Sequence, residues 1–220
     1  MALRKLCVIA GVGPGMGMAI ARRFKREGFE LALLARSRDA LDGYAGELGA
    51  EARGFTADLA DAGSIRAALA AVRREMGDAE VLVYNASRWR QVPTMQFDPA
   101  EFSEDLALDV TGALICAQAL HPAMRAAGRG SMLFTGSRVA IEPEAGQGTA
   151  SLTAGKAALR AFALALAGEL APDGIHVATV TIAGTIAAGS AFDPTVIAEH
   201  FARIHAEPRG SWTTEYVFRG

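Results

Sequence analysis

The sequence predicts an α/β fold in which residues 1–220 form a single domain with a doubly wound parallel β-sheet flanked by helices. Short apolar runs, typical of buried strands, alternate with longer segments in which apolar residues recur every three or four positions. A glycine-rich turn follows the first run, and no linker composition or long repeat divides the chain. With 51% hydrophobic residues in 220, the chain can bury one large core.

The first strand, residues 6–10, leads into a glycine-rich turn and a helix. The glycines occupy alternate positions: Gly11, Gly13, Gly15 and Gly17. Apolar residues then recur every fourth position, at Met16, Ile20 and Phe24. This order points the free N–H groups and positive dipole end of a helix at a phosphate. The spacing is GxxxGxG rather than GxGxxG, and Pro14 stiffens the turn. We therefore expect residues 11–17 to bind a nucleotide; the alternative is an ordinary turn.

The second strand, residues 29–35, ends at Arg36 and Ser37. In dinucleotide-binding folds an acidic residue at this point holds the ribose 2′-hydroxyl, whereas an arginine suits a 2′-phosphate. No acid is present, and the guanidinium of Arg36 can make charge-assisted hydrogen bonds to phosphate. The pattern favours NADP(H) over NAD(H), which stays possible because Arg36 could also be a solvated loop residue.

Two further strands end in polar residues. A helix over residues 39–48 precedes a strand at 52–57, followed by Asp58 and Leu59. Asp58 could contact an adenine or could cap the next turn. A core-facing helix then ends at Gly77, and the strand at residues 80–84 leads to Asn85, Ala86 and Ser87. We expect Asn85 to bridge neighbouring strands and line the cofactor cleft.

The second half continues the alternation. Asp98, Pro99 and Glu101 form a helix start, and that helix carries Asp109 and runs through residue 120. The strand at residues 131–135 ends near Ser137, and a loop at 141–149 precedes a helix with Lys156. A strand at 176–182, a helix from 193 to about 206 and a strand at 212–218 complete the chain.

Together these motifs resemble the short-chain dehydrogenase/reductase family over residues 6 to about 185. The matching positions are the loop at 11–17, the turn at 84–87, Ser137, Lys156 and the pair Ala183-Gly184. The resemblance implies a Rossmann fold that binds a nicotinamide cofactor, with Gly184 and Ile186 also beside it. It implies that Ser137 and Lys156 are catalytic residues, and that Lys156 also binds the cofactor's ribose.

The sequence departs from the family at the residue that transfers the proton. The family has a tyrosine four residues before the lysine, and the ammonium lowers its pKa. Here that position is Leu152, which cannot transfer a proton. Asp109 stands where the family has an asparagine, and it could pair with Lys156 as a third catalytic residue. Ser151 and Thr153 should point away from Leu152 on a helix, which leaves Ser137, Thr149 or water as proton donors.

Two functions are compatible with this pattern. The first is an NAD(P)-dependent short-chain oxidoreductase that prefers NADP(H) and acts on a carbonyl/alcohol pair through a degenerate proton-transfer site. The second, favoured by Leu152, is a catalytically inactive NADP(H)-binding protein that acts as a sensor or partner subunit. Trp89 and Arg90 could edge a substrate pocket or lie in a surface loop.

Composition narrows the partners. A net charge of −2 gives no electrostatic basis for binding nucleic acid or a membrane surface. The N-terminus has no signal-peptide pattern, and the apolar segment at 157–170 is too short to span a bilayer. Cys7 and Cys116 are expected to be buried reduced thiols, and the four histidines lack metal-ligand spacing. We therefore expect a cytoplasmic protein with a small-molecule substrate and no metal, and the family resemblance implies a homodimer or homotetramer.

Overall fold

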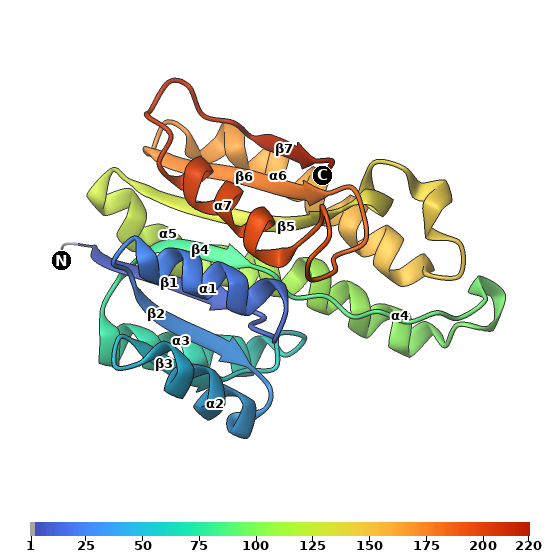
Figure 1. Ribbon diagram of the computed structural model, residues 1–220, viewed down its shortest axis with the longest axis horizontal. Helices are drawn as coiled ribbons and strands as arrows, with labels where there is room; N and C mark the ends of the chain where they lie inside the picture. The colour runs from blue at the N-terminus through green and yellow to red at the C-terminus, as the bar shows by residue number, and fades with distance from the viewer. Residues whose placement is uncertain (1–2) are drawn as a thin grey trace.

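Residues 3–220, which the computed structural model describes, contain a seven-stranded parallel sheet of order β3-β2-β1-β4-β5-β6-β7 (Figure 1). The predicted doubly wound α/β fold is confirmed. The strands are β1 (Arg4–Ala10), β2 (Glu30–Ala35), β3 (Ala52–Thr56), β4 (Ala79–Tyr84), β5 (Gly130–Ser137), β6 (Ile175–Ile182) and β7 (Glu215–Phe218). The α-helices are α1 (Met16–Arg26), α2 (Arg38–Leu48), α3 (Ala62–Met76), α4 (Pro99–Leu106), α5 (Gly112–Ala127), α6 (Ala150–Leu170) and α7 (Pro194–His205). Short helical turns are η1 (Thr94–Gln96), η2 (Ala107–Thr111), η3 (Arg138–Ala140) and η4 (Pro143–Gly146).

The helices form one layer on each face of the sheet (Figure 1). Successive strand residues point to opposite faces, so in β1 Leu6 and Val8 join the core beneath α3, α5 and α6. Cys7 and Ile9 join the core beneath α1, α2 and α7. Because both faces are covered, the five central strands are largely apolar runs, which is why they are visible in the sequence, whereas the edge strands β3 and β7 are only partly buried.

The strand order reverses between β1 and β4. From β1 the chain passes through α1 to β2 on one side, and β4 pairs with β1 on the other. Parallel sheets open a ligand crevice at the carboxyl ends of the strands at such a switch point. Gly11, which follows β1, has φ +90°, and a Cβ there would lie 2.6 Å from the backbone nitrogen of Ala86. The loops after β1 and β4 therefore meet at close backbone contact.

The helix that follows Asp98 differs from the prediction. The Asp98 carboxylate caps α4 by accepting a hydrogen bond from Ala100 N at 2.8 Å, as expected. A π-helical turn, η2, then separates α4 from α5, and the helix continues past residue 120 and past Pro122 to Ala127. It ends at Gly128, whose left-handed conformation (φ +65°) serves as the C-cap.

Helix α6 begins directly after the loop at 141–149, as predicted, and extends beyond the apolar segment at 157–170 toward the N-terminus. The apolar segment at residues 157–170 is the later part of a 21-residue helix that begins at Ala150. By length and composition, Pro99–Ala127 and Ala150–Leu170 could each cross a membrane, a test that core helices of water-soluble proteins also pass. Both contribute buried side chains to the core under the sheet.

Strand β7 is shorter than predicted because it begins at Glu215 rather than at residue 212. Trp212 instead stacks on the ring of His176, with centroids 5.0 Å apart and planes 4° from parallel.

Candidate functional site

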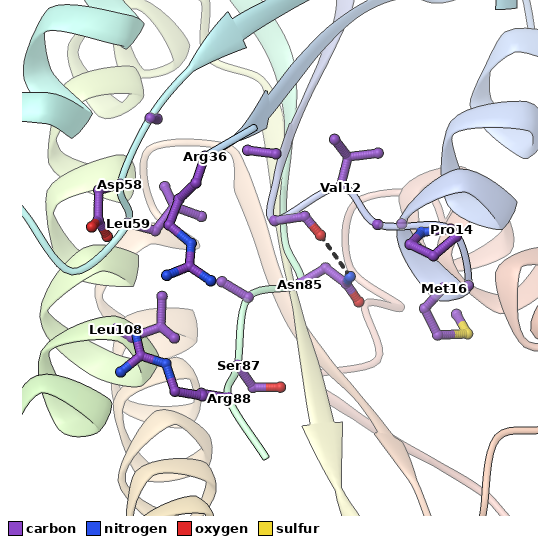
Figure 2. A pocket seen from close by; sticks show the side chains of 17 residues that line it. Val12, Pro14, Met16, Arg36, Asp58, Leu59, Asn85, Ser87, Arg88 and Leu108 are labelled. Carbon is purple, nitrogen blue, oxygen red and sulfur yellow. Dashed lines mark hydrogen bonds between the residues drawn. The ribbon is translucent and has the colours of Figure 1, made fainter. Parts of the chain in front are cut away.

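A cavity of about 330 Å³ lies at the carboxyl ends of β1, β2, β3 and β4; we call it the glycine-loop cavity (Figure 2). Predicted site residues that line it are residues 11 and 13–17, Arg36, Asp58, Leu59 and residues 85–87. The structure thus brings together side chains from four loops that are far apart in the sequence. Its volume falls within the range of cavities that hold small ligands.

The four glycines of the loop fall into two pairs. A Cβ at Gly11 would clash with Ala86, and one at Gly17 would lie 2.7 Å from the Cα of Val12, so these two glycines are required by packing. A Cβ at Gly13 or Gly15 would meet no protein atom within 4 Å. Both line the cavity, and Gly15 is the N-cap of α1, with no side chain bonded to it. The second pair therefore leaves the helix N-terminus open to a ligand, which fits a bound pyrophosphate.

Two guanidinium groups face the glycine-loop cavity. Arg36 extends from the end of β2, as predicted, and Arg88 extends from the loop after β4 (Figure 2). Arg88 is held by Asp105, whose Oδ1 lies 2.9 Å from its Nη1. The sequence analysis missed Arg88, although its position directly after residues 85–87 would have been a signal.

Two predicted site residues, Asp58 and Ser37, differ in whether they line the glycine-loop cavity. Asp58 lines the cavity and also caps the next turn by accepting a hydrogen bond from Ala60 N at 2.9 Å, so the predicted turn cap is present and the adenine contact stays a prediction. Ser37 is the N-cap of α2, and its Oγ accepts from Ala40 N at 3.2 Å. Ser37 does not line the glycine-loop cavity, because its side chain satisfies the helix start instead.

Asn85 connects three strands at the floor of the site. Its Nδ2 donates to Gly11 O at 3.0 Å, and its Oδ1 accepts from the Thr135 hydroxyl at 2.9 Å. Its backbone N–H donates to Ala10 O at 2.8 Å. The predicted bridging role is confirmed, and it fixes the ends of β1, β4 and β5 relative to one another.

A second cavity of about 510 Å³ adjoins the first; we call it the Lys156 cavity. Its lining includes four predicted site residues: Ser137, Lys156, Gly184 and Ile186. Trp89, which could edge a substrate pocket, and Leu152, which stands four residues before the lysine, line it as well. Four residues line both cavities: Gly15, Met16, Asn85 and Ser87. The two cavities therefore form one continuous cleft across the switch point.

Lys156 is buried at the base of this second cavity. Its Nζ donates to the backbone oxygens of Ala86 at 3.2 Å and Thr135 at 3.1 Å. Burial lowers the pKa of the ammonium from its usual range, and the charge of Asp109 partly opposes that effect. The lysine is thus fixed between the loops after β4 and β5.

Asp109 does not pair directly with Lys156 and does not line the Lys156 cavity. The carboxylate is 1% exposed in the turn η2, and neither oxygen has a hydrogen-bond partner among the described residues. It packs against α6, where a Cβ at Gly155 would lie 2.2 Å from its Oδ2. Burial raises the pKa of Asp109 to about 6. A direct ion pair is precluded because Lys156 points to the strand ends instead.

Hydroxyl groups near Leu152 are directed elsewhere. The Ser151 Oγ donates to Asp105 Oδ2 at 2.8 Å, and the Thr149 hydroxyl donates to Gly146 O at 2.9 Å. Thr153 faces Gly146, where a Cβ would lie 2.0 Å from its Oγ1. Of the proton donors that the sequence left open, Ser137 lines the Lys156 cavity and Thr149 does not; Ser87, Thr135 and Thr185 line it as well.

Among residues 3–220 no group of histidine, cysteine, aspartate or glutamate side chains has metal-binding geometry. Both cysteines are buried free thiols, as expected.

Comparison with known proteins supports the fold. The family profile for short chain dehydrogenase matches residues 5–191. The D-threitol dehydrogenase of Mycolicibacterium smegmatis is 30% identical over 139 residues, which are 62% of this chain and 54% of that protein. The 3-oxoacyl-[acyl-carrier-protein] reductase FabG of Escherichia coli K12 is 29% identical over 176 residues, 80% of this chain and 71% of that protein. Among solved structures, the L-sorbose reductase of Gluconobacter frateurii, complexed with NADPH and L-sorbose, has a TM-score of 0.90 at 26% identity, covering 100% of this chain and 96% of that one.

Proposed function

The chain belongs to the short-chain dehydrogenase/reductase family, and we propose that it is an NADP(H)-preferring oxidoreductase acting on a carbonyl/alcohol pair. The observation that carries the proposal is the continuous cleft. At one end it has an open helix N-terminus with Arg36 and Arg88, and at the other it has Ser137 and Lys156. The NADPH bound to the structurally similar sorbose reductase supports the choice of cofactor.

In this proposal the backbone of residues 13–17 binds the pyrophosphate, and Arg36 binds the 2′-phosphate in a charge-assisted contact. Asp58 and Leu59 border the adenosine half, and Asn85 and Lys156 border the ribose of the nicotinamide. When bound, NADPH supplies the hydride. Ser137 donates a hydrogen bond to the substrate oxygen and stabilises the charge that develops there.

We further propose that Leu152 stands at the family's tyrosine position. It lies one helical turn before Lys156 and lines the same cavity. With leucine there, the proton reaches the substrate oxygen from Ser137 or from water, and turnover is slow. Asp109 acts through the charge it places near Lys156, because it does not touch the Lys156 cavity.

Titration of the purified protein with NADPH and NADH, followed by nucleotide fluorescence, tests the proposal. We expect tight NADPH binding and weaker NADH binding, and then slow oxidation of NADPH by a ketone under single-turnover conditions. Binding of neither nucleotide would refute it. NADPH binding without any hydride transfer across a substrate panel would instead indicate the inactive binding protein.

We propose a homodimer or homotetramer in the cytoplasm. Leu114 is exposed on α5, a helix that is only partly covered by the sheet. Light scattering after size-exclusion chromatography tests the assembly, and a monomer at micromolar concentration would refute it.

A further inference from the structure

Trp89 is a large apolar side chain at the mouth of the Lys156 cavity. It is 68% exposed and lines the cavity together with Leu152 and Ile186. Single exposed apolar residues are common on protein surfaces, so exposure alone says little. What distinguishes Trp89 is how it is held and what it faces.

The backbone on both sides of Trp89 is fixed. The neighbouring residues Arg88 and Arg90 both bind the carboxylate of Asp105, with nitrogen–oxygen distances of 2.9 and 3.2 Å. Asp105 is itself 1% exposed. Three residues after Trp89, the backbone N–H of Val92 donates a hydrogen bond to Gly148 O at 2.8 Å. A ligand that stacks on the indole therefore meets a preorganised surface, so little loop ordering opposes binding.

The cavity that Trp89 borders has a polar side and an apolar side. The hydroxyls of Ser87, Ser137 and Thr185 line it and are available to a substrate, while its other polar side chains are paired within the protein. Asn85 and Thr135 hydrogen-bond each other, and Lys156 donates to two backbone oxygens. Leu152 and Ile182 add apolar surface to the lining. Substrate hydroxyls placed against this apolar side would be left unpaired, which is costly, whereas a flat apolar group there would not be.

We infer that the Lys156 cavity accepts a carbonyl compound with an aromatic ring next to the carbonyl, and that the ring stacks on Trp89. The inference rests on the proposed function and adds the substrate class. Aromatic pairs gain from ring geometry beyond the area they bury. The substrate oxygen then lies toward Ser137 while the ring lies between Trp89 and the apolar wall.

The test compares acetophenone with cyclohexyl methyl ketone, which has the same carbonyl and a saturated ring of similar size. Dissociation constants are measured by ligand-observed NMR, with and without saturating NADP⁺, which cannot reduce the ketone. We expect acetophenone to bind about 3- to 10-fold more tightly than its saturated analogue. Trp89→Phe should keep most of this preference and Trp89→Leu should abolish it. The matched control, Trp212→Phe, removes the tryptophan that stacks on His176 and should leave it unchanged.

Equal affinity for the two ketones, undetectable binding of acetophenone, or a preference that persists in Trp89→Leu would each overturn the inference. NADP⁺ binding is measured separately by calorimetry, so its presence alongside any of these results leaves the proposed function standing. In the Trp212→Phe protein the remaining tryptophan is Trp89, and acrylamide should quench it readily. A shielded Trp89 in the ligand-free protein would mean that another copy of the chain covers it, which also overturns the inference.

Discussion

Replacing Asp109 with asparagine should change how stability depends on pH. Asp109 is buried in the turn η2, and both its oxygens lack hydrogen-bond partners among the described residues. Its pKa rises from an ordinary 3.8 to about 6, first because of burial and also because of nearby Asp105, while Lys156 and Arg88 oppose the rise. The folded state therefore disfavours the charged carboxylate relative to the unfolded chain.

The sign and size follow from linkage. Below pH 3.8 the carboxyl is protonated in both states, and its contribution to stability is fully present. As the pH rises through 3.8 the unfolded state releases its proton first, so stability falls until the pH exceeds about 6. At about 1.4 kcal/mol per pKa unit, the loss at pH 8 is about 3 kcal/mol. Asparagine has nearly the same shape and cannot ionise, so the variant avoids this loss.

Urea unfolding of both proteins at several pH values between 4 and 8 measures the effect. The difference in unfolding free energy, variant minus wild type, should grow by about 2.5 kcal/mol from pH 4 to pH 8. Asp42→Asn, at an exposed carboxylate that faces Arg38, is the control and should give a flat difference. A flat difference for Asp109→Asn as well would refute the argument, because it would mean that the carboxylate is solvated or paired in the folded protein.

Four substitutions separate cofactor binding, fold stability and chemistry. Gly13→Ala places a methyl group in open space, so the thermal unfolding temperature should barely change while NADPH affinity falls about 10-fold. In Gly17→Ala the added methyl group meets the Cα of Val12, so the free energy of unfolding in urea should fall by about 1–3 kcal/mol. Arg36→Leu should weaken NADPH binding about 10-fold and leave NADH binding unchanged in the same fluorescence titration, and an equal loss for both would argue against a 2′-phosphate contact. Leu152→Tyr should accelerate single-turnover ketone reduction about 100-fold or more, and no gain would mean that Ser137 is misplaced for proton transfer.

The sequence was most informative where strands end. Because the central strands are largely apolar, the residue that follows each one is placed at the carboxyl edge, which is how Asn85 was predicted, while the role of Ser137 came from the family resemblance. Contacts between distant segments were not visible: the pairing of Arg88 with Asp105 depends on how α4 packs, and no local pattern encodes it. The capping role of Ser37 is local, since a serine before a helical segment is a capping signal that the cofactor interpretation passed over.

The two halves of the cleft depend on the sequence in different ways. The glycine-loop end is built largely from backbone, with Gly11 and Gly17 fixed by packing and Gly13 and Gly15 left open, so most side-chain changes nearby preserve its shape. The Lys156 end depends on individual side chains. In the proposed function Leu152 stands where the family has its acid, and α6 buries this leucine without disruption. In that proposal, loss of the proton donor need not entail loss of the cofactor. For that reason nucleotide affinity and hydride transfer have to be measured separately in this protein.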